Sequence, residues 1–277
     1  MAIALVLATL LIGLPASATA ATGPKLDAKA WTLIDPRDDS VLASSTPNKR
    51  LPIASTTKLM TAYLALKHLK PSQMIAAPNY HPSASAEIEL GLRPGERLRV
   101  RDLLYGLLLP SASDAAETLA VGVAGSESAF VTEMNQTAQQ LGLTDTSYAN
   151  PIGLDDPDNY SSAHDRVTLA SILLKNPLFA RIVNTPSATL HSGDHPRTVT
   201  SRDTLLNEVP WINGVKTGEV QEPRNDQIGG VVGGRIGLQL HWQTTYEPRS
   251  VSGGGMSNAM KPGHPLEFRN IAIKELP

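Results

Sequence analysis

Three short segments of this chain carry residue types that could attack a carbonyl group with a hydroxyl nucleophile. In the first segment, Ser55 and Lys58 lie three residues apart in the order S-x-x-K. A serine hydroxyl is a poor nucleophile until a neighbouring base removes its proton. A lysine amine can be that base if burial or a second positive charge lowers its pKa towards neutrality. Residues three apart share one face of a helix, so a helix here would place the hydroxyl beside the amine.

The residues around this pair predict a buried helix from about Ser55 to Leu66. Apolar residues recur there at helical spacing, namely Leu59, Met60, Tyr63, Leu64 and Leu66. Pro52 lies just outside the predicted start, where helices tolerate proline. The pair also has an ordinary explanation, because serine often caps helices and lysine is common in a first turn.

Two downstream segments favour the catalytic interpretation. Ser111-Ala112-Ser113 follows a predicted apolar helix at 100–109, and Lys216-Thr217-Gly218 ends a predicted strand at 211–218. The three segments follow the order S-x-x-K, S-x-N, K-T-G of β-lactamases and penicillin-binding proteins. Each downstream segment alone has a structural explanation, because Ser111 could cap the next helix and K-T-G could be an exposed strand end.

The pattern of the remaining chain predicts an α+β fold. A first hairpin is expected at 30–35 and 40–43, with later helices at 115–123, 128–141 and 167–174 and loops at 84–97 and 148–160. Residues 235–242 and 266–273 alternate with period two, which predicts two more strands. Because strands flank a helical block, we expect the last strands to rejoin the first hairpin.

With these motifs the chain resembles the low-molecular-mass D-alanyl-D-alanine carboxypeptidases, serine peptidases of the bacterial cell wall. The resemblance covers about residues 30–218 and includes the longer blocks Ile53–Ala62, Asp102–Ser111 and Asn213–Gly218. It implies a β-lactamase/transpeptidase-like fold. In that fold an antiparallel sheet carries a helical subdomain, inserted between the first hairpin and the K-T-G strand.

The resemblance also implies roles for the first two motifs. Ser55 would attack the carbonyl between the two terminal D-alanines of a peptidoglycan stem peptide. Lys58 would take the Ser55 proton, and Ser111 would relay a proton to the leaving amine. Water would then hydrolyse the acyl-enzyme and release the shortened peptide.

For the third motif, the resemblance implies that Lys216 and Thr217 bind the terminal carboxylate of the substrate. Lys216 would also add a positive field that keeps Lys58 neutral. Gly218 would let the substrate backbone lie against the strand edge. The backbone N–H of Ser55 and one just past Gly218 would form an oxyanion hole. The same acylation chemistry implies that β-lactams act as covalent inhibitors.

The chain departs from the family pattern at Ser113, where the motif has asparagine. That amide would hold Lys58 and the substrate peptide, and a serine hydroxyl offers one donor instead of two. We therefore predict weaker positioning by Ser113, costing on the order of 10- to 1000-fold in rate.

A second departure lies after Gly218. Residues 219–226 are polar and contain a proline, where the family continues with a short turn, two strands and a helix. Residues 234–277 weakly resemble the closing strands of a bacterial sugar-hydrolase or lectin-like jelly-roll domain. If the tail strands fail to pair beside Lys216, an open sheet edge would remain. We therefore divide the chain into a signal segment at 1–21, a catalytic domain at 22–218 and a glycine-rich tail at 219–277.

The composition of the chain argues against several kinds of partner and chemistry. The chain has 277 residues, 41% of them hydrophobic, which is enough for one large domain or two small ones. Its net charge of -2 gives no reason to expect a nucleic-acid partner. It has no cysteine, which excludes disulfides and thiolate chemistry. Its histidines are dispersed and form no metal-ligand pair, so we predict neither a metal nor a cofactor.

The first residues predict export. Residues 2–14 are continuously apolar, Pro15 ends the run, and residues 16–21 offer two A-x-A cleavage sites. This is a signal-peptide pattern, although no lysine or arginine precedes the apolar run. We expect an extracytoplasmic protein in the periplasm or at the cell-wall face of the membrane. An uncleaved membrane anchor or a buried helix is the alternative.

The sequence therefore favours an exported serine carboxypeptidase that acts on stem peptides ending in D-Ala-D-Ala. A catalytically impaired cell-wall or carbohydrate-binding protein on the same scaffold is the alternative that Ser113 and the tail motivate. A β-lactamase is a third interpretation. It would need a glutamate that activates the deacylating water, and no convincing candidate lies at 148–165.

Overall fold

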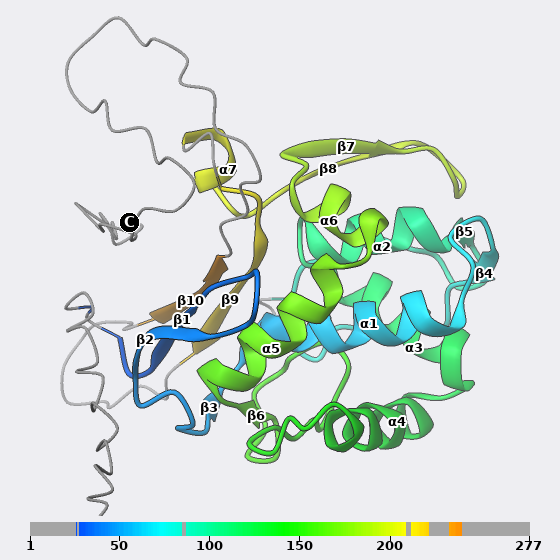
Figure 1. The fold of residues 1–277 in the computed structure, drawn as a ribbon. Coiled ribbons are helices and arrows are strands. Elements are labelled where there is room, and N and C mark those ends of the chain that lie inside the picture. Colours follow the sequence, from blue (N-terminus) through cyan, green and yellow to red (C-terminus); the bar gives the residue numbers. More distant parts are fainter. Residues whose placement is uncertain (1–25, 27, 85–86, 209–211, 222–232, 240–277) are drawn as a thin grey trace, which may run out of the picture.

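The computed structural model describes residues 26, 28–84, 87–208, 212–221 and 233–239 (Figure 1). These residues form a block of helices with short strand pairs around it. The described strands form five separate two-stranded sheets. None of the described helices is long and apolar enough to cross a membrane.

The first predicted hairpin is confirmed. Strand β1 (Trp31–Ile34) pairs antiparallel with β2 (Val41–Ser45). At the other end, β9 (Val215–Gln221) pairs antiparallel with β10 (Gly233–Gln239), and Gly218 faces Ile236 across the pair. The tail strand expected at 235–242 is thus confirmed, although it begins two residues earlier, at Gly233. The strand expected at 266–273 lies outside the described residues.

Two predictions about these strands were wrong. The K-T-G strand does not end at Gly218 but continues to Gln221, because pairing with β10 gives its backbone hydrogen-bond partners that the polar sequence does not reveal. The two hairpins also share no hydrogen-bonded pairing among the described residues, so the last strands do not rejoin the first ones there. In Figure 1 both hairpins lie on the same side of the helical block.

The predicted helices are confirmed with small shifts at their ends. They are α1 (Lys58–His68), α2 (Val100–Leu108), α3 (Ser113–Ala124), α4 (Glu127–Gln140) and α5 (Ala163–Leu174). Helix α5 begins earlier than the apolar pattern predicts, because the Ser162 hydroxyl caps it by accepting from the Asp165 N–H at 3.1 Å. Ser55 lies one step outside α1, on the short 3₁₀ helix η1 (Ala54–Thr57).

Several short elements were not predicted. They are α6 (Pro177–Val183), α7 (Leu205–Glu208) and the strand pairs β3 (Leu51–Pro52) with β6 (Tyr160–Ser161), β4 (Met74–Ala76) with β5 (Arg97–Arg99), and β7 (Ser187–Leu190) with β8 (Arg197–Thr200). Helix α6 does carry a start signal, since the Asn176 side chain caps it and Pro177 opens it. The strand pairs are too short for period-two alternation to stand out.

Helix α1 forms the centre of the core. Its apolar residues Leu59, Met60, Ala62, Leu64 and Ala65 are fully buried. Helices α2, α3, α4 and α5 all contact it, as Figure 1 illustrates. A helix that is covered on nearly every side is held rigidly, which suits an element that carries Lys58 at its first position.

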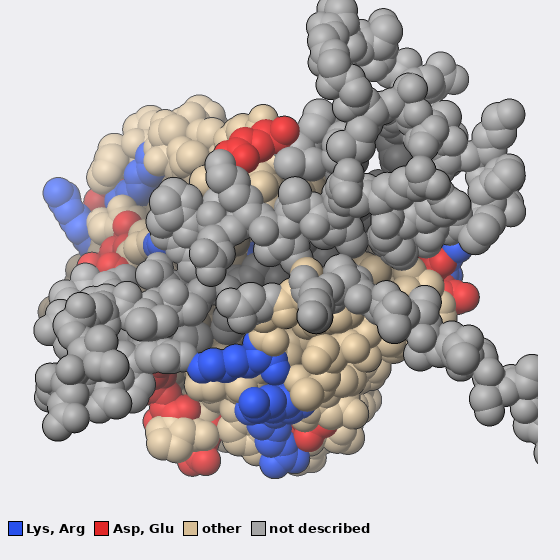
Figure 2. Space-filling view, turned by 90° about the vertical axis from the view of Figure 1, so that its left-hand side faces the viewer, with Lys and Arg blue, Asp and Glu red and all other residues tan. Residues whose placement is uncertain are grey.

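Charge on the surface is mixed. On the face shown in Figure 2, acidic and basic side chains of the described residues both reach the surface. This agrees with the formal net charge of -2.

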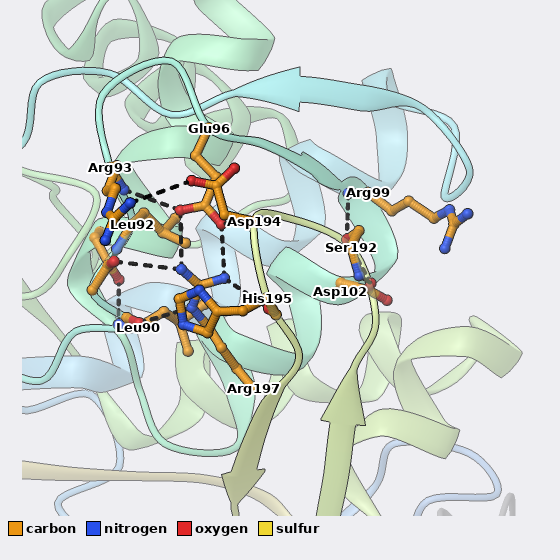
Figure 3. Close-up of polar contacts among 12 residues, drawn as sticks. Leu90, Leu92, Arg93, Glu96, Arg99, Asp102, Ser192, Asp194, His195 and Arg197 are labelled. Atoms are coloured by element: carbon orange, nitrogen blue, oxygen red, sulfur yellow. Dashed lines mark hydrogen bonds and ion pairs between the residues drawn. The ribbon is translucent and has the colours of Figure 1, made fainter.

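A buried ion pair ties the loop before β5 to the β7–β8 hairpin. The Glu96 and Arg197 side chains form two parallel hydrogen bonds, Nη1 to Oε1 at 2.8 Å and Nη2 to Oε2 at 2.9 Å (Figure 3). The Glu96 carboxylate also accepts from the N–H of Arg93 at 3.1 Å and of Asp194 at 2.8 Å. Burial works to raise the pKa of Glu96, but Arg197 and these N–H groups hold it at about 2.

A second buried contact joins the same hairpin to α2. The Asp102 carboxylate accepts hydrogen bonds from the Ser192 N–H at 3.0 Å and from the Ser192 hydroxyl at 2.6 Å (Figure 3). The β7–β8 hairpin is therefore fastened both to the loop and to the helix that leads into Ser111.

Candidate active site

The structure brings Ser55 and Lys58 together. The Lys58 Nζ atom lies 3.4 Å from Ser55 Oγ, at hydrogen-bond distance. Lys58 is buried, whereas Ser55 is partly exposed. The ammonium or amine also donates to the Ile152 carbonyl. The Ser55 hydroxyl is thus accessible from outside, while the Lys58 amine beside it is shielded from water.

Burial makes Lys58 suitable as a base near neutral pH. It lowers the pKa of Lys58 to about 7. The negative charges of Glu87 and Asp114 act in the opposite direction, and the positive charge of Arg202 acts with burial. About half of the Lys58 side chains are then neutral at pH 7, and a general base is most effective when its pKa lies near the working pH.

The backbone is strained directly before Ser55 and at Ser111 itself. Ala54, directly before Ser55, has φ +42°, and Ser111 itself has φ +73°. L-residues with side chains rarely adopt this left-handed region, and it costs about 1–3 kcal/mol when the surrounding structure enforces it. Such strain clusters at functional sites because it aims a side chain that relaxed geometry would turn away.

The Ala54 conformation depends on a close approach by Gly153. A Cβ atom on Gly153 would lie 2.1 Å from the Ala54 carbonyl oxygen, and Gly153 has φ +87°. Only glycine fits there without moving the segment that carries Ser55.

Ser111 and Lys216 form the second contact of the site. The Lys216 Nζ atom donates to Ser111 Oγ at 3.0 Å and to the Thr217 carbonyl at 2.8 Å. Both side chains are buried. Burial first, and then the positive charges of Lys58 and Arg202, hold the pKa of Lys216 well below its usual value.

Strand β9 packs directly against η1, and Gly218 permits this contact. A Cβ on Gly218 would lie 3.3 Å from the Ile53 carbonyl oxygen and from the Thr56 nitrogen. The glycine therefore brings the K-T-G strand close to the nucleophile segment. Thr217, beside it, is partly exposed.

Ser113 occupies a different environment from the other motif residues. It is buried at the first position of α3, and its N–H donates to the Ile88 carbonyl at 2.7 Å. The loop before β5 thus supplies the backbone partner of this serine.

The sequence did not point to three of the groups that shape the site. Tyr80 and Glu87 lie on the loop between β4 and β5, which contains none of the three motifs. Arg202 lies shortly after β8 and is also outside the motifs. The charge of Glu87 raises the pKa of Lys58, the charge of Arg202 lowers the pKa of Lys58 and Lys216, and the Tyr80 hydroxyl donates to the Glu87 carboxylate. No periodicity or spacing links such residues to a site, because only the packing of the loops brings them near it.

Comparison with known proteins agrees with this geometry. The family model described as D-alanyl-D-alanine carboxypeptidase matches residues 17–236. The chain belongs to the D-alanyl-D-alanine carboxypeptidase family. Members are serine peptidases, so the resemblance stated from the sequence is confirmed, together with its implied function class. The match runs past Gly218 into β10, so it extends beyond the 30–218 region that the motifs suggested.

Two named relatives are D-alanyl-D-alanine carboxypeptidases. The chain is 36% identical over 215 residues to D-alanyl-D-alanine carboxypeptidase DacB2 of Mycobacterium tuberculosis, covering 76% of this chain and 73% of that protein. It is 32% identical over 203 residues to D-alanyl-D-alanine carboxypeptidase DacF of Bacillus subtilis, covering 72% of this chain and 52% of that protein. The chain thus spans about half the length of the Bacillus relative.

Solved structures confirm the fold class. A putative penicillin-binding protein homologue from Mycobacterium tuberculosis matches with a TM-score of 0.67 and 34% identity, over 79% of this chain and 87% of that one. Penicillin-binding protein 6B from Escherichia coli matches with a TM-score of 0.67 and 29% identity, over 73% and 67%. The α+β, transpeptidase-like architecture of this carboxypeptidase family member is therefore established.

Proposed function

We propose that this protein removes the terminal D-alanine from peptidoglycan stem peptides through a covalent acyl-enzyme on Ser55. The observation that carries the proposal is the buried Lys58 amine, 3.4 Å from Ser55 Oγ, with a pKa of about 7. A base so placed can take the hydroxyl proton at neutral pH.

In acylation, Ser55 Oγ bonds to the carbonyl carbon between the two D-alanines while its proton passes to Lys58 Nζ. Breakage of the carbon–nitrogen bond then needs a proton on the leaving amine. Ser111 can deliver one through its hydroxyl and regain a proton from Lys58, which returns Lys58 to its neutral form before deacylation. Lys216 holds the Ser111 hydroxyl at 3.0 Å. The products are an ester on Ser55 and free D-alanine.

In deacylation, water attacks the ester carbon while Lys58 accepts the water proton. The carbon–oxygen bond to Ser55 breaks, and Ser55 Oγ recovers a proton from Lys58. The shortened stem peptide leaves as a carboxylate. The backbone N–H of Ser55 and one beyond Gly218 would stabilise the oxyanion in both steps.

Lys216 and Thr217 are proposed to bind the terminal carboxylate of the substrate. An anion beside Lys216 favours its charged form, so substrate binding itself would raise the pKa that burial has lowered. Before the substrate arrives, burial and the nearby charge of Lys58 keep the pKa of Lys216 low, because two charged amines in this buried site would repel each other. Ser113 would contribute a single hydroxyl to substrate positioning, which predicts a lower rate than an amide would allow.

A fluorescent penicillin tests the proposal. We expect a stable adduct on the mature protein, mapped to Ser55 and absent in Ser55→Ala, together with release of D-alanine from a D-Ala-D-Ala peptide. Absence of any adduct at saturating penicillin would overturn the proposal and support a non-catalytic wall-binding protein. Rapid turnover of a chromogenic cephalosporin would instead indicate a β-lactamase.

We also propose that the protein works outside the cytoplasm, where peptidoglycan lies. The signal-like segment at residues 1–21 supports export. Mass spectrometry of the protein from fractionated cells should find it in the extracytoplasmic fraction with an N-terminus near residue 22. An intact segment in the membrane fraction would indicate an uncleaved anchor.

A further inference from the structure

The loop between α4 and β6 lies against the segment that carries the candidate nucleophile and base. The Ile152 carbonyl of this loop accepts a hydrogen bond from Lys58 Nζ. The next residue, Gly153, lies so close to Ala54 that a Cβ atom on it would be 2.1 Å from the Ala54 carbonyl oxygen. Two consecutive loop residues thus contact the base and the residue that precedes Ser55.

The Asn150 side chain folds this part of the loop. Its side-chain oxygen accepts from the N–H groups of Gly153 at 2.7 Å and Leu154 at 3.0 Å. Its side-chain amide donates to the Leu154 carbonyl at 3.1 Å. An asparagine that bonds in this way to backbone groups further along the chain closes a tight turn. Because the turn encloses Ile152 and Gly153, Asn150 fixes the two residues that contact the nucleophile segment.

Two buried side chains fasten the same loop to its neighbours. Thr61 Oγ1 on α1 donates to the Pro151 carbonyl at 2.7 Å. The Asn159 side chain donates to the Leu154 carbonyl at 3.1 Å and lies 3.4 Å from the Thr57 hydroxyl on η1. Thr61 and Asn159 are both buried. The loop is therefore attached to both elements that carry the candidate catalytic pair.

The Ile152 carbonyl orients the Lys58 amine. A carbonyl oxygen only accepts hydrogen bonds, so one N–H of Lys58 must point at it. This contact restricts rotation of the amine, whose lone pair can then face Ser55 Oγ, 3.4 Å away. A general base acts only when it can reach the proton that it removes.

We propose that Asn150 is a positioning residue of this active site. It folds the loop whose Ile152 carbonyl holds the Lys58 amine in the orientation that takes the Ser55 proton, and Thr61 fastens that loop to α1. Asn150 acts through the backbone of the loop. This inference rests on the proposed roles of Ser55 and Lys58.

The test is the labelling of Ser55 by a fluorescent penicillin, measured on the full chain at pH 9, where little of Lys58 is protonated. Time courses at several penicillin concentrations separate three quantities: the dissociation constant of the initial complex, the acylation rate constant, and the fraction of molecules that label. Asn150→Ala removes the three hydrogen bonds of the side chain. We expect the acylation rate constant to fall by about 10- to 100-fold, with little change in the dissociation constant.

Asn150→Asp should restore most of the rate. A carboxylate oxygen can still accept from the N–H groups of Gly153 and Leu154, so the turn should persist. Asp156→Ala is the matched control, because the Asp156 side chain closes another turn of the same loop by accepting from the Asp158 N–H at 2.8 Å, but at an exposed position. Its acylation rate constant should equal that of the unmodified protein.

Thr61→Val keeps the test decisive if Asn150→Ala does not fold. Valine keeps the shape of the side chain but removes the hydrogen bond to the Pro151 carbonyl, so the acylation rate constant should again fall.

Three results would overturn the inference. They are an unchanged rate constant in Asn150→Ala or in Thr61→Val, an equal loss in Asp156→Ala, and a smaller labelled fraction that reacts at the unmodified rate, which marks a purely structural defect. Failure of the unmodified protein to label at Ser55 would instead overturn the proposed function.

Discussion

At the residue scale, the proposed reactivity of Ser55 depends on the protonation of Lys58. The Lys58 amine lies beside the Ser55 hydroxyl, and burial lowers its pKa to about 7. The fraction of Lys58 amines that are neutral, and so able to accept a proton, therefore rises as the pH increases through about 7. We therefore expect the pH dependence of the site to follow the pKa of the buried Lys58. Nearby negative charges raise this pKa, and the positive charge of Arg202 lowers it.

This predicts the pH profile of the unmodified protein. Acylation of Ser55 by penicillin should rise with pH, reach half its plateau near pH 7, and follow a single ionisation. Lys58→Ala should lower the plateau by roughly 10²- to 10⁴-fold, since it removes the general base. A profile that is flat from pH 5 to 9 would exclude Lys58 as the base.

Lys216 should behave differently from Lys58. Lys216→Ala removes the proposed carboxylate partner and leaves Ser55 and Lys58 in contact. We expect a loss in kcat/KM for D-Ala-D-Ala peptides of roughly 10- to 100-fold, by the size of a lost charged hydrogen bond of about 1.5–3 kcal/mol. Kinetics with a peptide amide, which lacks the carboxylate, should show little effect of the change.

At the scale of elements, the site is formed where η1, the end of α2 and β9 meet. Ser55 lies on η1, Ser111 follows α2, and Lys216 lies on β9. Where these elements meet, the backbone adopts uncommon conformations or comes unusually close. Ala54 and Ser111 have positive φ, and glycine at positions 153 and 218 allows the close approach of neighbouring backbone. The helices and the strand hold the site residues rigidly. The unusual backbone positions set the directions in which their side chains point.

Gly153→Ala should therefore disturb the nucleophile segment. The added methyl would meet the Ala54 carbonyl, so the segment must shift or the loop must move. We expect a loss of roughly 1–3 kcal/mol in the free energy of unfolding and slower labelling of Ser55. Gly142→Ala is the control, because Gly142 also has positive φ but has nothing within 4 Å of its Cβ position. Equal labelling rates in the two variants would contradict this account.

At the scale of the whole molecule, the contacts that stabilise the fold also hold the loop that lies against the candidate active site. The Glu96–Arg197 pair joins the loop before β5 to the β7–β8 hairpin (Figure 3). The same loop contacts α3 through the hydrogen bond from the Ser113 N–H to the Ile88 carbonyl. The pair is buried on both sides, with side-chain exposures of 0% and 7% for Glu96 and Arg197. Its loss should thus loosen both the fold and the site.

Glu96→Gln should cost about 3–5 kcal/mol of unfolding free energy, because it leaves Arg197 charged and poorly paired. The stabilising contribution of Glu96 is present above its usual pKa of 4.5 and is lost as pH falls towards its folded value of about 2. Denaturant unfolding at several pH values should show a smaller loss between pH 5 and 2 in the variant. Asp194→Asn, which breaks the nearby exposed pair with Arg93, should cost less than about 1 kcal/mol.

The sequence by itself determined the chemistry and most of the regular elements. Motif spacing identified Ser55, Lys58, Ser111 and Lys216, and the structure brings these four into two hydrogen-bonded pairs. Helical periodicity located five helices, because each buries an apolar face over several turns. These features are local, so they can be read from neighbouring residues.

Only the tertiary structure decided how the motifs meet and which other groups act on them. Extension of β9 to Gln221 depends on its partner β10, and the hydrogen bond from the Ser113 N–H to the Ile88 carbonyl depends on a loop held by Asp114 and Arg197. The lowered pKa of Lys58 likewise arises from burial by distant segments. Such effects come from contacts between residues far apart in the chain, and neither periodicity nor spacing encodes those contacts.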